Sequence, residues 1–113
     1  MPRRKHDDLA AREHLARRVR QARVQKGMTQ QELAEEVDAA VQTVSRWESA
    51  KLWPSLPTIY RLAKILNVEI EALVGEGPAG LSSKEAEVVE SWRQLDTEGQ
   101  AKNGYIGSSM GTK

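Results

Sequence analysis

Two short amphipathic segments, joined by a connection of only three residues, are the feature that most restricts what this chain can fold into. The segments cover residues 30–37 and 41–48. Each has apolar side chains three or four positions apart, namely Leu33 and Val37 in the first and Val44 and Trp47 in the second. This spacing predicts helices with one buried side. Thr29 and Glu32 have the capping-box spacing that marks the start of the first helix. Two helices joined so closely must cross, which predicts a helix-turn-helix.

Apolar residues at helical spacing also flank this unit on both sides. They predict further helices over residues 9–26, 56–66, 69–74 and 82–98. Gly27 suits the end of the first of these helices, and Ser55 suits the start of the second. The sequence therefore predicts an all-α fold without strands. Five helices form a domain over residues 9–74, with the helix-turn-helix at about 30–49, and an amphipathic helix follows at the C-terminal side.

The remaining segments are predicted to connect or to extend this domain. Residues 1–8 are basic and lack periodicity, which indicates a flexible arm, and residues 75–81 have the composition of a linker. Residues 99–113 are rich in Gly and Ser, which is typical of a disordered tail. The helix over residues 82–98 carries an apolar stripe of Val88, Trp92 and Leu95. A short helix is marginal alone in water, so the stripe is expected to pack against its own domain or against a second copy.

Charge is distributed unevenly along the chain. The formal net charge is only +1, but residues 1–26 carry nine Lys and Arg against three Asp and Glu, which gives +6. A solvated helix face and a local contact with a polyanion both explain such a segment.

The residue types exclude several classes of site. Without cysteine there is neither a disulfide framework nor a thiolate zinc site, which fits a cytoplasmic location. The apolar runs are too short for a signal peptide or a membrane-spanning helix. His6 and His14 lack the clustered ligands of a metal site. No acid–base pair, nucleophile elbow or glycine-rich phosphate loop is present, so we expect no metal, no cofactor and no enzymatic activity.

Residues 28–51 (MTQQELAEEVDAAVQTVSRWESAK) and 54–73 (PSLPTIYRLAKILNVEIEAL) resemble the lambda-repressor-like helix-turn-helix family of regulators, also called the xenobiotic-response-element family. The resemblance covers about residues 15–74. It rests on features in register: Thr29-Gln30, Leu33-Ala34, Val44-Ser45, Trp47-Glu48, Pro54-Ser55, and Leu66-Asn67-Val68 with Leu73.

The resemblance implies five helices, with the third lying in the major groove of DNA. It implies base contacts by Val41, Gln42, Ser45 and Arg46, and phosphate contacts by Gln30, Thr43 and Lys51. It also implies a buried ion pair between Arg23 and Glu48. The base-contact residues suit their expected partners chemically, because Gln pairs with adenine and Arg with guanine through two hydrogen bonds each.

Three residues depart from the family pattern. Asp38 and Ala50 stand where glycine is usual, and Ala40 stands where Ser or Thr caps the third helix. Loss of a cap costs about 1 kcal/mol, so the fold is expected to survive these changes.

The resemblance implies a sequence-specific regulator that binds double-stranded DNA, as a repressor acting on an inverted-repeat operator in the form of a homodimer. The alternative is an antitoxin or bridging protein whose main ligand is a partner protein, bound through residues 82–98. The sequence contains no group of residues that favours a hydrolase or a transferase. No membrane partner is expected.

Overall fold

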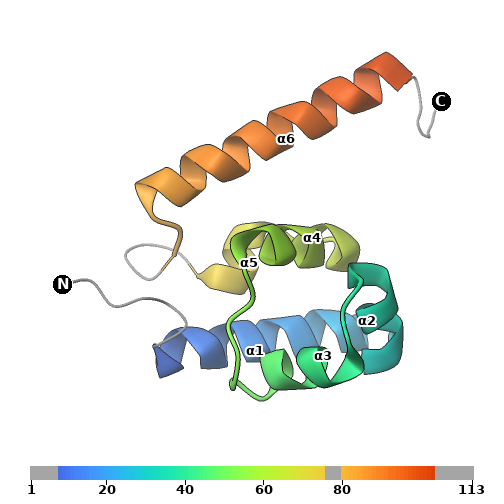
Figure 1. Ribbon diagram of the computed structural model, residues 1–113, viewed down its shortest axis with the longest axis vertical. Helices are drawn as coiled ribbons and strands as arrows, with labels where there is room; N and C mark the ends of the chain where they lie inside the picture. Colours follow the sequence, from blue (N-terminus) through green and yellow to red (C-terminus); the bar gives the residue numbers. More distant parts are fainter. Residues whose placement is uncertain (1–7, 76–79, 104–113) are drawn as a thin grey trace. The chain divides into compact units, whose positions relative to one another are not determined.

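Six helices make up the part of the chain that the computed structural model describes, which is residues 8–75 and 80–103, with side chains described as far as residue 96. They are α1 (Leu9–Gln25), α2 (Gln30–Val37), α3 (Val41–Glu48), α4 (Leu56–Leu66), α5 (Ile70–Val74) and α6 (Ser83–Asn103), drawn in Figure 1. No strand occurs within these residues, and the predicted all-α fold is confirmed. The chain divides into two compact units, Met1–Leu81 and Ser82–Lys113, so α6 is separate from the first five helices.

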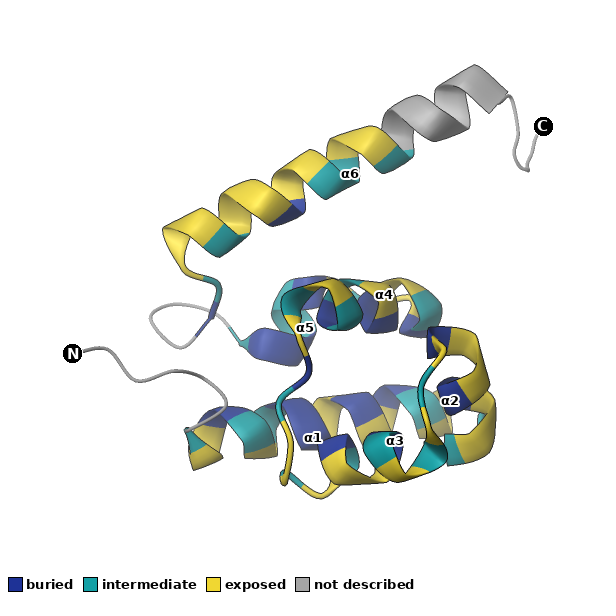
Figure 2. Ribbon diagram, in the orientation of Figure 1, coloured by how far each residue is buried: buried dark blue, intermediate teal, exposed yellow. Residues whose placement is uncertain are grey.

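The first unit is held together by aliphatic side chains that its five helices direct inward. α1 packs against α3, α4 and α5, while α2 packs against α3 and α4. Fully buried side chains come from every helix: Leu15, Val19, Leu33, Val37, Val44, Ile59, Leu62, Ile70 and Leu73. Figure 2 shows the buried positions of this unit facing its interior and the exposed positions facing outward. α3 contributes a larger anchor as well, because Trp47 is only 3% exposed.

Side-chain caps begin α1, α2 and α4, at Thr29 and Ser55 as the sequence predicts and at Asp8, which was predicted to belong to the flexible arm. The Asp8 side chain accepts a hydrogen bond from the amide of Ala11, which starts α1. Thr29 and Glu32 form both bonds of the capping box of α2, at 3.0 and 2.8 Å. Ser55 accepts a bond from the amide of Thr58 at the start of α4. Each cap satisfies an amide that the helix itself leaves unpaired, which fixes the first residue of the helix.

One backbone motif ends each of the first four helices. The first or second residue after the helix is left-handed, and the amide that follows it donates to a carbonyl near the end of the helix. The left-handed residues are Gly27, Asp38, Ala50 and Asn67. Their following amides donate to the carbonyls of Arg23, Ala34, Arg46 and Ala63, at 2.9 to 3.0 Å. Asp38 and Ala50 therefore occupy the glycine positions of the family without changing the turn. Ala50 is the more strained of the two, because Asp tolerates the left-handed conformation better than Ala does.

α6 begins at a capping box that the sequence analysis did not identify. The amide of Glu85 donates to the Ser82 hydroxyl, and the amide of Ser82 donates to the Glu85 carboxylate. The helix continues to Asn103, beyond residue 98, where it was predicted to end. Gly99 suggested a tail, but a single glycine costs a helix only about 1 kcal/mol. Residues 1–7, 76–79 and 104–113, which include most of the predicted arm, linker and tail, lie outside the described residues.

Two residues of the apolar stripe predicted for α6 are exposed, Val88 at 39% and Leu95 at 64%. Within the described ranges, no helix has the length and apolarity needed to cross a membrane.

Candidate nucleic-acid interface

The two sides of α3 have opposite character. Val44 and Trp47 anchor the inner side in the core, with exposed fractions of 0% and 3%. The outer side presents Gln42, Ser45 and Arg46, all of which are exposed. Val41 and Thr43 are half-buried at the first turn. The structure therefore brings the four residues implied as base contacts onto one short helix, and it exposes the three polar ones.

The start of α3 lacks the side-chain cap found at α1, α2 and α4. Ala40 stands at the N-cap position and offers no side-chain acceptor to the first turn. The backbone compensates in part, because the Ala40 carbonyl accepts from the amides of Thr43 at 3.0 Å and Val44 at 3.2 Å. α3 therefore forms without the expected Ser or Thr cap. Contacts near its C-terminal end must hold it in position.

An ion pair ties the end of α3 to α1. Arg23 donates from Nε to Oε2 of Glu48 at 2.7 Å and from Nη2 to Oε1 at 2.9 Å, so the pair is bidentate. The side chains are 12% and 4% exposed. The hydrogen bonds and the charge of Glu48 raise the pKa of Arg23 above its usual value, against the opposing effect of burial. Arg23 also donates to the Met28 carbonyl at 2.7 Å, which fixes the turn between α1 and α2.

Gln30 belongs to the same network. Its amide nitrogen donates to Oε1 of Glu48 at 3.0 Å, and the side chain is half-buried. One N–H of Gln30 is therefore engaged inside the protein, while a primary amide has a second one to donate. The sequence analysis assigned Gln30 to a phosphate and gave no indication of this contact, because its partner Glu48 lies on another helix.

Lys51 follows α3 in an exposed position, on a turn that α1 holds in place. The Nε atom of Arg12 donates to the Ala50 carbonyl at 2.8 Å, across 38 residues of sequence. The Lys51 amide donates to the Arg46 carbonyl at 2.9 Å. The sequence analysis missed Arg12, since no spacing rule links a residue of α1 to a carbonyl after α3.

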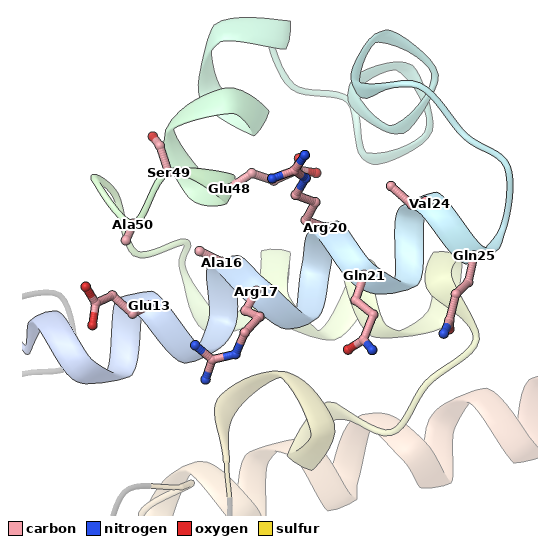
Figure 3. Close-up of a pocket in the computed structure, with 10 residues that line it drawn as sticks. All are labelled: Glu13, Ala16, Arg17, Arg20, Gln21, Val24, Gln25, Glu48, Ser49 and Ala50. Atoms are coloured by element: carbon pink, nitrogen blue, oxygen red, sulfur yellow. The ribbon is translucent and has the colours of Figure 1, made fainter.

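A wide, open hollow of about 910 Å³ lies between α1 and the end of α3. Figure 3 shows its lining, with Ser49 and Ala50 at the end of α3 opposite the side chains of α1. Three α1 residues that line it carry charge, namely Glu13, Arg17 and Arg20. In the part of the chain that is described, no three His, Cys, Asp or Glu side chains gather as metal ligands.

Comparison with known proteins agrees with this geometry. A family model described as "Helix-turn-helix" matches residues 19–73. An uncharacterized HTH-type transcriptional regulator of Archaeoglobus fulgidus is 41% identical over 56 residues, which are 50% of this chain and 80% of that protein. The HTH-type transcriptional activator BcrR of Enterococcus faecalis is 32% identical over 57 residues, which are 50% of this chain and 28% of that protein.

A solved structure also matches most of the chain. A chain of the SinR protein/SinI protein complex aligns with a TM-score of 0.52 and 25% identity, covering 78% of this chain and 97% of the other. The two curated relatives are named as HTH-type transcriptional regulators, a non-enzymatic class, in agreement with the sequence prediction. The chain belongs to the lambda-repressor-like helix-turn-helix family of DNA-binding transcriptional regulators.

Proposed function

We propose that this protein binds double-stranded DNA sequence-specifically, with α3 in the major groove. The observation that carries the proposal is the exposed outer side of α3, where Gln42, Ser45 and Arg46 lie opposite a fully anchored inner side. Arg46 would donate two hydrogen bonds to guanine, and Gln42 would pair with adenine. Ser45 would donate to or accept from a neighbouring base, and Val41 would contact a thymine methyl group.

Three residues around α3 would contact the DNA backbone. Lys51 is exposed directly after the helix, and Thr43 lies in its first turn. Gln30 would use its second N–H for a phosphate while Glu48 holds the first. Contacts of this kind fix the register of a protein on DNA without reading its sequence.

A homodimer on an inverted repeat would double this small interface. A single eight-residue helix reaches few base pairs, and two copies related by a two-fold axis would read half-sites about 34 Å apart. We further propose that the protein is a repressor in the cytoplasm, because a bound dimer would block a promoter without further contacts. Membership of the family does not decide between repression and activation, since one relative is named as an activator.

Selection of duplexes from a random library with the purified chain tests this proposal. We expect enrichment of one inverted repeat whose half-sites lie about one helical turn apart. Recovery of random duplexes only would refute sequence-specific binding. Enrichment of a single half-site would refute the dimer alone. A reporter promoter that carries the selected site would then separate repression from activation.

A second function is favoured by α6, where Val88 and Leu95 are exposed. An antitoxin or bridging protein would use such a helix to bind a partner protein, and one similar structure is named as a complex of two proteins. The two functions differ in one measurement. Replacing Val88 and Leu95 by Gln would abolish partner capture and leave the affinity for a single half-site unchanged if α6 serves a partner.

A further inference from the structure

The outer side of α1 carries two arginines that the fold does not use. Arg17 and Arg20 are exposed, and neither makes a hydrogen bond or ion pair with another described residue. Two other arginines of this helix are engaged, Arg12 with the Ala50 carbonyl and Arg23 with Glu48. The positive charge of Arg17 and Arg20 is therefore available to an external anion.

These two arginines border the hollow between α1 and the end of α3. Figure 3 shows Arg20 extending from α1 toward α3, whereas Arg17 extends from α1 in the direction away from α3. Small side chains, Ala16 and Ala50, line the space between them. A backbone of another molecule can thus approach α1 closely here, within reach of long flexible guanidinium groups.

The acidic groups near the hollow do not cancel this charge. Glu48 lines it, but its side chain is 4% exposed and both carboxylate oxygens accept hydrogen bonds from Arg23 or Gln30. Glu13 is exposed and stands one helical turn before Arg17 on α1. The hollow is therefore basic around Arg17 and Arg20, with one carboxylate that would weaken an anion's binding.

The hollow is continuous with the proposed DNA-reading side of α3. Gln42, Ser45 and Ser49 follow one another at helical spacing along that side, and Ser49 also lines the hollow. A duplex with α3 in its major groove would have its sugar–phosphate backbone beside the end of the helix. We propose that Arg17 and Arg20 bind this flanking phosphate backbone, which extends the DNA footprint onto α1. The inference rests on the proposed function and adds a sequence-independent site to it.

The test compares variants of the full chain by fluorescence anisotropy with two labelled duplexes, a mixed-sequence duplex and the duplex selected above. The variants are Arg17→Gln, Arg20→Gln and the double change. Arg18→Gln is the matched control, because Arg18 is exposed on the same helix but lines a different hollow, between α1 and α5. Thermal unfolding of each variant verifies that the fold is retained.

Counterion release sets the expected size of the effect. Each lost phosphate contact should reduce the slope of log affinity against log salt by about 0.9, which corresponds to about eightfold weaker binding at about 0.1 M salt. Arg18→Gln should change the affinity by less than about twofold, since screened charges at a distance contribute little. Glu13→Gln should strengthen binding of both duplexes, because it removes the one exposed carboxylate of the hollow.

Three results would contradict one of the two proposals, either the phosphate contacts of Arg17 and Arg20 or the sequence-specific binding of DNA. If Arg17→Gln and Arg20→Gln match Arg18→Gln in slope and affinity, the hollow does not bind phosphates, although the function stands. If they leave DNA binding unchanged but dissociate a dimer in sedimentation, the hollow binds protein and the inference is wrong. If the unaltered chain binds both duplexes equally, sequence-specific binding fails, while the loss of slope on the mixed-sequence duplex still measures the arginine contacts.

Discussion

Replacing Glu48 by Ala should destabilise the protein strongly, because it breaks the ion pair that joins α3 to α1. Glu48 accepts three hydrogen bonds, two from Arg23 and one from Gln30, while its side chain is 4% exposed. Truncation leaves the Arg23 guanidinium in a site that is 12% exposed, with only the Met28 carbonyl as a remaining acceptor. The main cost is this stranded charge.

The magnitude follows from the partial burial of the pair. Removing one partner of a buried ion pair costs about 3–5 kcal/mol, and the residual exposure of Arg23 places the expected loss near the lower limit, at about 3 kcal/mol. In a domain of this size, 1 kcal/mol lowers the melting temperature by about 4–8 °C, so Glu48→Ala should lower it by at least about 12 °C. Arg23→Ala should cost a similar amount, since it strands the carboxylate of Glu48.

Thermal and urea unfolding, followed by circular dichroism, measures these free energies. The control is the double change Arg23→Met with Glu48→Met, which removes both charges and should be less destabilising than either alanine change. The double change Arg23→Ala with Glu48→Ala closes the cycle with the two single alanine changes, and its difference from additivity gives the coupling energy, expected at about 2 kcal/mol. Single losses below about 1 kcal/mol that add without coupling would show that the pair is not a buried, cooperative contact.

Three further outcomes are expected. Ala50→Gly should raise the free energy of unfolding by about 1 kcal/mol in the same assay, because it relieves a left-handed alanine with φ of 64°; an unchanged or lower stability would contradict this strain. Arg46→Ala and Gln42→Ala should each cost about 1–3 kcal/mol on the selected duplex and flatten the preference at one or two base positions. Lys51→Ala should weaken selected and random duplexes alike and lower the salt slope by about 0.9, so identical profiles for all three changes would refute the assignment of base and phosphate contacts.

Helix boundaries could be predicted because local signals determine them. α2, α3 and α4 occupy the ranges expected from the sequence, and caps at Thr29 and Ser55 start two of them. The end of α6 could not be predicted in this way. Gly99 resembles a helix end, but a glycine that is not left-handed costs too little to stop a helix.

Apart from the Arg23–Glu48 ion pair, which the family resemblance implies, the arrangement of the site could be predicted only where its residues lie on one helix. The exposure of Gln42 and Arg46 follows from the positions of Val44 and Trp47, because the helical period assigns opposite sides to the two sets. Contacts between helices have no such rule. The bond from Arg12 to the Ala50 carbonyl depends on how α1 crosses α3, which the local sequence does not encode.

The length of α3 explains why so many anchors surround it. A helix of eight residues is unstable alone in water, and Ala40 gives it no side-chain cap. Its orientation must therefore come from Trp47 in the core, from Glu48 bound to α1, and from the turn that Arg12 holds. None of these anchors uses the outer side of the helix. Substitutions on that side can consequently change which bases are read at little cost in stability, whereas changes in the anchors should alter stability and DNA binding together.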